Sequence, residues 1–418
     1  MTRRVVVTGL GVISPIGNDV ASMWQSVLDA KCGIDKITHY DTEGRKVTLA
    51  GEIKNMDYDA YIDKRELKKM DPYTQFGMVA AIQAFQDAGI APVEEGEDTF
   101  ESRGNWGCIM ASGIGGIGTI EAEQIRGTEK GFDRVSPFFI PMAISNMAAG
   151  QIAIKYGLHG HTTCVVTACT SSANAIGDAF RHIRDGYGDL MLAGGAEAAI
   201  TPLSIGGFTS LKALSKAEDP SRASIPFDKE RNGFVMGEGA GALVLEEYEH
   251  AKARGAKIYG EIVGYGANCD AHHITAPLED GKGAALCMKQ ALEDAGIEPK
   301  DVDYINAHGT ATPMNDRCET AAVKRLFGED AKKVKMSSTK SMTGHLLGAS
   351  GAVESVITVK AVQENFLPPT IHYQLPDEDC DLDIVPNKGY EYPIQYAISN
   401  SFGFGGHNGT IVFKKFSE

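Results

Sequence analysis

Two segments of this chain return later in the sequence in altered form, and this repetition limits the possible folds more than any other feature. The stretch AFQDAGIAP at residues 84–92 returns as ALEDAGIEP at 291–299. A second stretch, GAGALVLEE at 239–247, returns as HNGTIVFKK at 407–415. Because the two echoes keep their order, they predict a duplicated fold.

The two copies should join near residues 250–257, where a short helix-like segment closes at Gly255. We therefore expect an N-terminal half at residues 1–252 and a C-terminal half at 253–418. The echoes are offset by 207 and 168 residues, so the first half should carry the larger insertions.

Apolar, β-branched runs recur along the chain and alternate with segments typical of helices. The runs are hydrophobic throughout rather than at every second position, which predicts strands covered on both faces. We expect strands at residues 5–8, 109–111, 165–167, 190–193, 243–245, 258–263, 304–306 and 411–413. The predicted fold class is therefore α/β with largely buried sheets.

The charge and hydropathy of the chain narrow its partners. A net charge of −15 opposes binding to nucleic acid or to an anionic membrane. No apolar run approaches the roughly 20 residues of a membrane span, and the first residues enter a strand without a signal-peptide core. We expect a cytoplasmic protein. One basic cluster, Lys64, Arg65, Lys68 and Lys69, fits equally an ordinary solvated helix face or a docking site for an acidic partner.

The cysteines and histidines do not suggest a metal site. The eight cysteines are scattered without CxxC pairs, which predicts free thiols rather than a disulfide framework. His159, His161 and Cys164 lie close together, but no second cluster completes a tetrahedral set. We expect no bound metal.

Cys169 follows the apolar run at residues 165–167 and precedes a helix-forming segment. The free N–H groups and positive dipole end of a helix favour an anion, so this position predicts a thiol with a lowered pKa. Taken alone, Cys169 would more often be a small core residue, as most free cysteines are, and only the rest of the chain favours the nucleophile.

Two histidines stand in glycine-rich turns at the ends of a strand and a helix. His308 follows the run at 304–306, and His345 lies five positions after Lys340. A nucleophilic thiol with two hydrogen-bond donors is the equipment needed to form a thioester and to stabilise an enolate. By order along the two copies, Cys169 and His345 should occupy equivalent helix starts.

Four ordered motifs carry a resemblance to a known family. They are TACTSSANAIGDA (167–179), INAHGTATPMND (305–316), KSMTGHLLGASG (340–351) and NSFGFGGHNG (400–409). The chain resembles the β-ketoacyl-acyl carrier protein synthases of fatty acid synthesis, most closely the elongating synthase II type. The resemblance implies the duplicated thiolase fold, layered αβαβα, in a homodimer.

The resemblance also implies roles for individual residues. Cys169 would take the acyl chain, and His308 and His345 would flank the malonyl thioester carbonyl. The N–H groups of Cys169 and Phe404 would form the oxyanion hole, and Phe404 would also gate the cysteine. Lys340 would form an ion pair with Glu354 that helps to hold the protonation states of the site.

Other residues match positions that bind substrate or carrier in the family. Thr310 and Thr312 match hydroxyls that bind the pantetheine arm, while Ile114, Phe139 and Phe208 match the acyl tunnel. Five basic residues match positions that meet the acidic acyl carrier protein: Arg65, Lys68, Lys69, Arg134 and Lys212. No cofactor is implied, because the phosphopantetheine belongs to the carrier protein.

Other functions remain open at this stage. A ketosynthase of a polyketide or other specialised pathway carries the same motifs, and a non-catalytic partner subunit would lack the cysteine that this chain has. A degradative thiolase would use a second cysteine as base and coenzyme A thioesters, and the second histidine, His345, argues against it. A Cys/His hydrolase would need water at the acyl-enzyme, which an apolar tunnel closed by Phe404 would exclude. His161, Ser172 and His407 depart from the family's usual residues and leave the chain-length preference undetermined.

Overall fold

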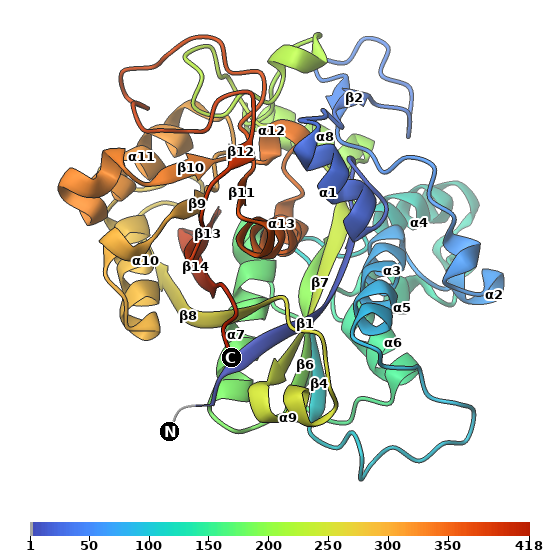
Figure 1. The fold of residues 1–418 in the computed structure, drawn as a ribbon. Coiled ribbons are helices and arrows are strands. Elements are labelled where there is room, and N and C mark those ends of the chain that lie inside the picture. Colours follow the sequence, from blue (N-terminus) through green and yellow to red (C-terminus); the bar gives the residue numbers. More distant parts are fainter. Residues whose placement is uncertain (1–2) are drawn as a thin grey trace.

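The computed structural model describes residues 3–418. Its centre is a ten-stranded sheet in the order β10-β9-β13-β14-β8-β1-β7-β6-β4-β5 (Figure 1). The strands of this sheet are β1 (Val5–Ile13), β4 (Trp106–Ala111), β5 (Thr162–Thr163), β6 (Leu190–Glu197), β7 (Gly239–Glu247), β8 (Gly260–Cys269), β9 (Tyr304–Asn306), β10 (Lys335–Ser337), β13 (Tyr396–Gly403) and β14 (His407–Lys414).

Helices cover this sheet, and two small strand pairs lie outside it. The helices are α1 (Val20–Leu28), α2 (Lys64–Leu67), α3 (Pro72–Asp87), α4 (Ile117–Lys130), α5 (Phe139–Ala143), α6 (Met147–Tyr156), α7 (Ser171–Arg184), α8 (Pro202–Ser210), α9 (Tyr248–Ala253), α10 (Lys282–Ala295), α11 (Pro313–Phe327), α12 (Lys340–Thr343) and α13 (Ser350–Glu364). The small pairs are β2 (Asp35–Lys36) with β3 (Leu49–Ala50), and β11 (Phe366–Leu367) with β12 (Tyr390–Glu391). Among residues 3–418, no helix is long and apolar enough to cross a membrane.

The sheet consists of two halves with the same strand pattern. The first runs β1-β7-β6-β4-β5 and the second β8-β14-β13-β9-β10, with antiparallel pairs followed by parallel pairs in each. The halves meet where β1 pairs antiparallel with β8, with Val5 opposite Ile262. The duplication predicted from the echoes is therefore present in the backbone.

Helices fill three layers around the two halves. α7 and α13 pack against each other in the middle, α3 covers β1 and β7 on one outer face, and α10 covers β8 and β14 on the other (Figure 1). The first echo lies at the ends of α3 and α10, and the second lies on β7 and β14. Both echoes thus occupy equivalent places, and the predicted layered α/β fold is confirmed.

One strand prediction was wrong. Seven of the expected runs overlap strands, but residues 165–167 lie outside the sheet, and the edge strand β5 is limited to Thr162–Thr163. The chain turns away because the N–H of Thr167 bonds the Ser171 hydroxyl at 2.9 Å and Ala168 adopts a left-handed φ of 52°. Val166, expected to be covered on both faces, is 55% exposed.

The predicted equivalence of Cys169 and His345 was also wrong. A 3-10 turn at Ala168–Thr170 leads into α7, and a matching turn at Leu347–Ala349 leads into α13. Ala168 and Leu347 share a left-handed φ, 52° and 48°, so these two residues correspond. Cys169 is therefore equivalent to Gly348, and His345 lies outside the matching turn.

Candidate active site

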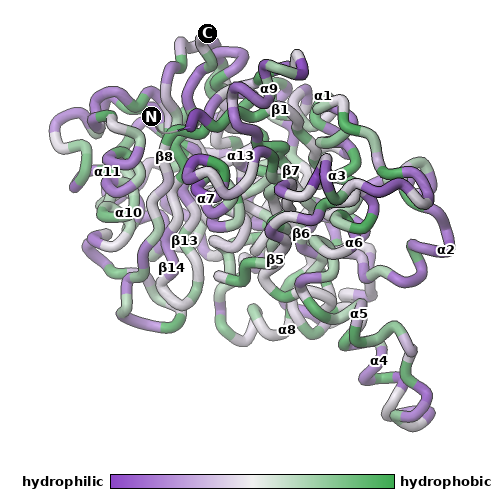
Figure 2. The backbone as a smooth tube through the Cα atoms, turned by 90° about the horizontal axis from the view of Figure 1, so that it is seen from below, coloured by the Kyte–Doolittle hydropathy of each residue, from purple (hydrophilic) through white to green (hydrophobic). Residues whose placement is uncertain are grey.

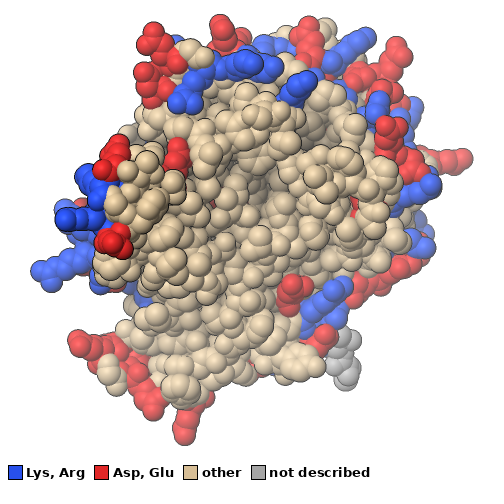
Figure 3. All heavy atoms as spheres, turned by 180° about the vertical axis from the view of Figure 1, so that it is seen from behind, with Lys and Arg blue, Asp and Glu red and all other residues tan. Residues whose placement is uncertain are grey.

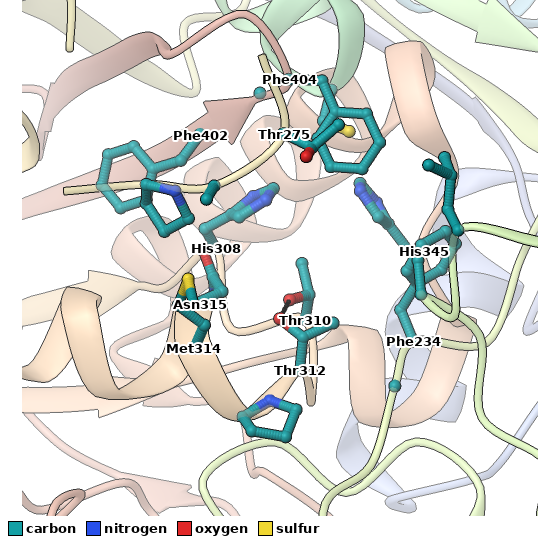
Figure 4. A pocket seen from close by; sticks show the side chains of 18 of the residues that line it. Phe234, Thr275, His308, Thr310, Thr312, Met314, Asn315, His345, Phe402 and Phe404 are labelled. Carbon is teal, nitrogen blue, oxygen red and sulfur yellow. Dashed lines mark hydrogen bonds between the residues drawn. The ribbon is translucent and has the colours of Figure 1, made fainter. Parts of the chain in front are cut away.

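A cavity of about 390 Å³ brings together residues from both halves of the fold. Cys169 and Phe208 come from the N-terminal half, while His308, His345 and Phe404 come from the C-terminal half. In Figure 4 the imidazoles of His308 and His345 point into the same space, beside Phe404. Four residues predicted for the chemistry, Cys169, His308, His345 and Phe404, therefore line one pocket.

Cys169 lies in the 3-10 turn before α7, with its side chain half-buried. The backbone N–H groups of Phe404 and of Cys169 itself lie near its sulfur and favour a thiolate. Burial nevertheless raises the pKa of the Cys169 thiol to about 12, because removing a thiolate from water outweighs these N–H groups and the nearby Lys340 ammonium. The predicted lowering of this pKa was wrong, and the resting thiol is neutral.

The two imidazoles lie 5.3 Å apart between ring centroids and are nearly perpendicular, at 87°. Both side chains belong to residues that are 3% exposed. Burial, with a further contribution from the Lys340 ammonium, holds the pKa of His308 and the pKa of His345 well below the usual value. Both rings are therefore neutral at pH 7 and each carries a single N–H.

The backbone of each histidine is held by its neighbours. The N–H of His308 donates to Glu319 at 2.9 Å. The N–H of His345 donates to the carbonyl of Val235 at 2.7 Å, and its own carbonyl accepts from Gly237 at 2.8 Å. Sequence reasoning missed Glu319, whose pKa is raised by burial to about 7.

Lys340 and Glu354 form a buried ion pair behind the histidines. The residues are 1% and 3% exposed, and one oxygen of Glu354 has no hydrogen-bond partner among the described residues. Burial raises the pKa of Glu354 to about 7, although the Lys340 ammonium opposes this change. The Lys340 ammonium of this pair lies close enough to lower the pKa of both imidazoles and to oppose the raised pKa of the thiol.

The predicted substrate residues are only partly brought together. Thr310 and Thr312 line the cavity, and their hydroxyls are 2.9 Å apart. The Phe208 ring lies 6.3 Å from that of Phe404, and Ile114 packs in the same apolar cluster as Phe208 and Cys169. Phe139 lies on α5 and is not among the residues that line this cavity.

The five predicted docking residues do not form a ring around the cavity. Lys212 is exposed and lines it. Arg65 and Lys68 are exposed at α2, whereas Lys69 pairs with Glu66 at 2.8 Å. Arg134 is exposed in the segment between α4 and α5, which projects from the body of the protein (Figure 2).

Sequence reasoning also missed Glu197, a carboxylate with no exposed surface at the end of β6. It accepts hydrogen bonds from the hydroxyl of Ser112 and from the N–H groups of Gly113, Ile114 and Gly348, at 2.8 to 3.1 Å. These donors come from the turn after β4 and from the turn before α13. The one available signal was an acidic residue closing the buried run LMLAGGAE.

The three departures from the family pattern occupy different places, and one of them, His407, is the first residue of β14. His161 stacks on His182 with centroids 5.3 Å apart, away from the cavity lining. The Ser172 hydroxyl accepts the N–H of Ala352 at 2.9 Å and so joins α7 to α13.

Within residues 3–418, no group of three or more metal-ligating side chains is placed to hold an ion.

Comparison with known proteins gives matches over the whole chain. The family model described as beta-ketoacyl synthase, N-terminal domain, matches residues 2–251, and the corresponding C-terminal domain matches 259–374. The 3-oxoacyl-[acyl-carrier-protein] synthase 2 of Staphylococcus aureus (strain COL) is 51% identical over 414 residues, covering 99% of each chain. The protein of the same name from Synechocystis sp. (strain ATCC 27184 / PCC 6803 / Kazusa) is 51% identical over 415 residues, covering 99% of this chain and 98% of its own.

Solved structures match equally completely. A beta-ketoacyl synthase from Burkholderia phymatum STM815 superposes with a TM-score of 0.91 at 33% identity, covering 99% of this chain and 100% of its own. A type II polyketide ketosynthase, solved in complex with its acyl-carrier protein and bound to a hexaketide, superposes with a TM-score of 0.90 at 39% identity over 100% of both chains.

Proposed function

Since the chain belongs to the β-ketoacyl synthase family, we propose that Cys169 is its nucleophile and that His308 and His345 stabilise the enolate of the malonyl group. The fold is the duplicated, layered αβαβα thiolase fold of ketosynthases. The enzyme is an acyltransferase, a β-ketoacyl-acyl carrier protein synthase of fatty acid biosynthesis. It joins a Cys-bound acyl chain to malonyl carrier protein by decarboxylative condensation and lengthens the chain by two carbons.

The first step transfers the acyl chain to Cys169. The sulfur attacks the thioester carbonyl, a new C–S bond forms, and the carrier thiol leaves with the proton that the Cys169 thiol gives up. The N–H groups of Cys169 and Phe404 would hold the negative oxygen of the tetrahedral intermediate, since both lie near the sulfur. The observation that carries this proposal is the meeting of thiol, N–H pair and two imidazoles in one pocket.

The second step forms the carbon–carbon bond. The bond between the malonyl α-carbon and its carboxylate breaks, CO₂ leaves, and the electron pair becomes an enolate. Neutral His308 and His345 would donate hydrogen bonds to the enolate oxygen, where negative charge develops. The enolate carbon then attacks the acyl thioester, and the Cys169 sulfur departs and regains a proton. Ketosynthases of this family use no added cofactor, because the phosphopantetheine is carried by the substrate.

Intact mass spectrometry tests these roles. We expect wild-type protein to gain an acyl adduct from a medium-chain acyl carrier protein, and Cys169→Ala to gain none. Malonyl carrier protein should then discharge the adduct as β-ketoacyl product with release of CO₂. Discharge as free fatty acid would identify a hydrolase, and absence of an adduct would remove Cys169 from the chemistry.

We further propose that the acidic acyl carrier protein docks through Arg65, Lys68, Lys69, Arg134 and Lys212. A local basic surface is the means by which a chain of net charge −15 can attract an acidic partner. Lys212 at the cavity and the exposed Arg65 and Lys68 support this assignment. Charge reversal at Arg65 and Lys68 should raise KM for the carrier-bound substrate and leave kcat nearly unchanged; a fall in kcat alone would contradict docking.

We also propose that the protein forms a homodimer. Figure 3 shows a broad face without charged side chains, with Lys, Arg, Asp and Glu gathered at its rim. The elements on this side include α8, β5 and the projecting α4–α5 segment (Figure 2). Exposed apolar side chains lie on or directly after these elements and on the neighbouring α6, namely Ile140, Ile144, Ile154, Val166 and Leu203. A tunnel role for Phe139 would then require it to reach the cavity of the second copy.

Sedimentation of the purified protein tests this assembly. We expect twice the chain mass of 44.7 kDa, and the chain mass alone for Ile154→Asp combined with Val166→Asp. A wild-type monomer with full activity would contradict the proposal.

We also propose that the two halves of the chain divide between residues 252 and 253. We propose a cytoplasmic location as well, and the eight free cysteines support it.

A polyketide ketosynthase is the second candidate function, favoured by the match to a type II polyketide ketosynthase at 39% identity. The full-length identity of 51% to 3-oxoacyl synthases favours fatty acid synthesis. A non-catalytic chain-length subunit fits less well, because Cys169 and both histidines line the cavity.

A further inference from the structure

Ser350 is the first residue of α13 and is 1% exposed. Its hydroxyl lies 2.8 Å from Nδ1 of His345, the imidazole that lines the cavity. The equivalent Ser171 at the start of α7 donates to the carbonyl of Ala168 at 2.6 Å and accepts from the N–H of Thr167 at 2.9 Å. The same serine position therefore serves the backbone in one copy and an imidazole in the other.

The direction of the hydrogen bond follows from the partners of the Ser350 hydroxyl. Within the described part of the chain, the contact with Nδ1 is the one hydrogen bond of this buried oxygen. If Nδ1 carried the imidazole hydrogen, the hydroxyl hydrogen would be buried without an acceptor, which is strongly unfavourable. The hydroxyl therefore donates, Nδ1 accepts, and the single hydrogen of neutral His345 lies on Nε2.

We propose that Ser350 is a positioning residue that holds His345 in the Nε2–H tautomer, so that its donor faces the enolate oxygen. The proposal rests on the function proposed above, in which His345 is a hydrogen-bond donor. A neutral imidazole in the other tautomer would present a lone pair to the enolate and repel it. His308 differs, because its Nδ1 has no hydrogen-bond partner among residues 3–418.

Nuclear magnetic resonance of the wild-type protein tests the tautomer directly. In protein labelled with ¹⁵N-histidine, two-bond couplings from the ring carbon-bound hydrogens identify the protonated nitrogen, and His345→Ala assigns the signal by its loss. We expect Nε2–H for His345 at pH 7. An Nδ1–H tautomer would overturn the proposal, and this outcome needs no variant at position 350.

Three variants test the consequence for catalysis. Ser350→Ala removes the hydroxyl and should slow CO₂ release from malonyl carrier protein about tenfold, as expected for loss of one orienting hydrogen bond. Acylation of Cys169 should be unchanged, because His345 acts on the malonyl group. Ser350→Thr keeps the hydroxyl and should restore much of the rate. Ser355→Ala is the matched control, since Ser355 is buried in the same helix and its hydroxyl donates to Gly351 at 2.6 Å.

The outcomes separate this proposal from the proposed function. Equal slowing by Ser350→Ala and Ser355→Ala, or a Ser350→Ala rate within about twofold of wild type, would overturn the role of Ser350. A wild-type protein that forms no acyl adduct would overturn the proposed function, while the tautomer measurement would still decide whether Ser350 orients the ring. A mixture of His345 tautomers in Ser350→Ala, but not in the wild-type protein or in Ser355→Ala, would support the role of Ser350.

Discussion

The turns before α7 and before α13 have the same backbone but opposite uses. Each begins at a residue with left-handed φ, Ala168 or Leu347, and each leads through a 3-10 turn into a buried helix that starts with serine. The second position of the first turn is Cys169, which faces the cavity. The second position of the other turn is Gly348, whose N–H donates to the Glu197 carboxylate at 2.9 Å.

This difference shows how a duplicated fold makes one active site rather than two. Both turns direct backbone N–H groups toward an anion, as the start of a helix does. In the first copy the N–H group of Cys169 stays available at the cavity. In the second copy a carboxylate from β6 already occupies the corresponding position, and the turn becomes a structural joint between the halves. Side chains, rather than backbone geometry, decide which copy performs chemistry.

The largest expected effect comes from giving the first turn the residue of the second. Cys169→Gly removes the nucleophile, so condensation should fall by about a thousandfold or more. Decarboxylation of malonyl carrier protein should persist within about tenfold, because both histidines that stabilise the enolate remain. Product formation and CO₂ release are measured separately; an equal loss of both would mean that the thiol is needed for decarboxylation too.

Adding a side-chain carbon at the second turn should lower the stability of the protein rather than its catalytic activity. A Cβ added at Gly348 would lie 2.2 Å from the backbone nitrogen of Gly113 and 2.7 Å from Glu197. Gly348→Ala should therefore lower the free energy of unfolding by about 2–4 kcal/mol. Gly206→Ala in α8 is the control, since a Cβ there meets nothing within 4 Å. Chemical denaturation measures both, and equal stability of the two variants would contradict the tight joint.

The pH dependence of Cys169 alkylation tests whether the first turn activates its thiol at rest. Below a pKa of about 12 the thiolate fraction rises tenfold per pH unit, so the rate with iodoacetamide should climb steadily from pH 6 to 9. Glutathione, with an ordinary thiol, should begin to level near pH 8.5. Peptide mass spectrometry follows Cys169 alone. A plateau near pH 7 would indicate a stable thiolate and would contradict the raised pKa.

The sequence predicted the features that depend on motifs and on their order along the chain. It did not predict the features that depend on contacts between segments distant in sequence. The echoes located equivalent elements because buried helices and strands keep their apolar patterns after duplication. The pKa of Cys169 could not be obtained this way, because its burial is produced by segments distant in sequence. Glu197 was missed for the same reason, since its donors at Ser112 and Gly348 come from turns far apart in the chain. Residues 165–167 do not form a strand because the chain turns there, and hydropathy alone does not predict this turn.

The smallest expected effect, from Glu197→Gln, separates the two turns. An amide nitrogen in place of one oxygen would face N–H groups that now have an acceptor, so the free energy of unfolding should fall by about 1–3 kcal/mol. The negative charge of Glu197 also raises the pKa of Cys169, so its removal should lower that pKa and speed alkylation a few-fold at fixed pH.

Glu391→Gln, on the exposed strand β12, controls for the loss of one charge and should change neither property. Reduced stability with unchanged alkylation would confine Glu197 to closing the second turn. Faster alkylation with unchanged stability would mean that the N–H groups of Gly113, Ile114 and Gly348 need no anion, and the comparison between the turns would fail. Both changes together require that one carboxylate closes the second turn and sets the reactivity of the first.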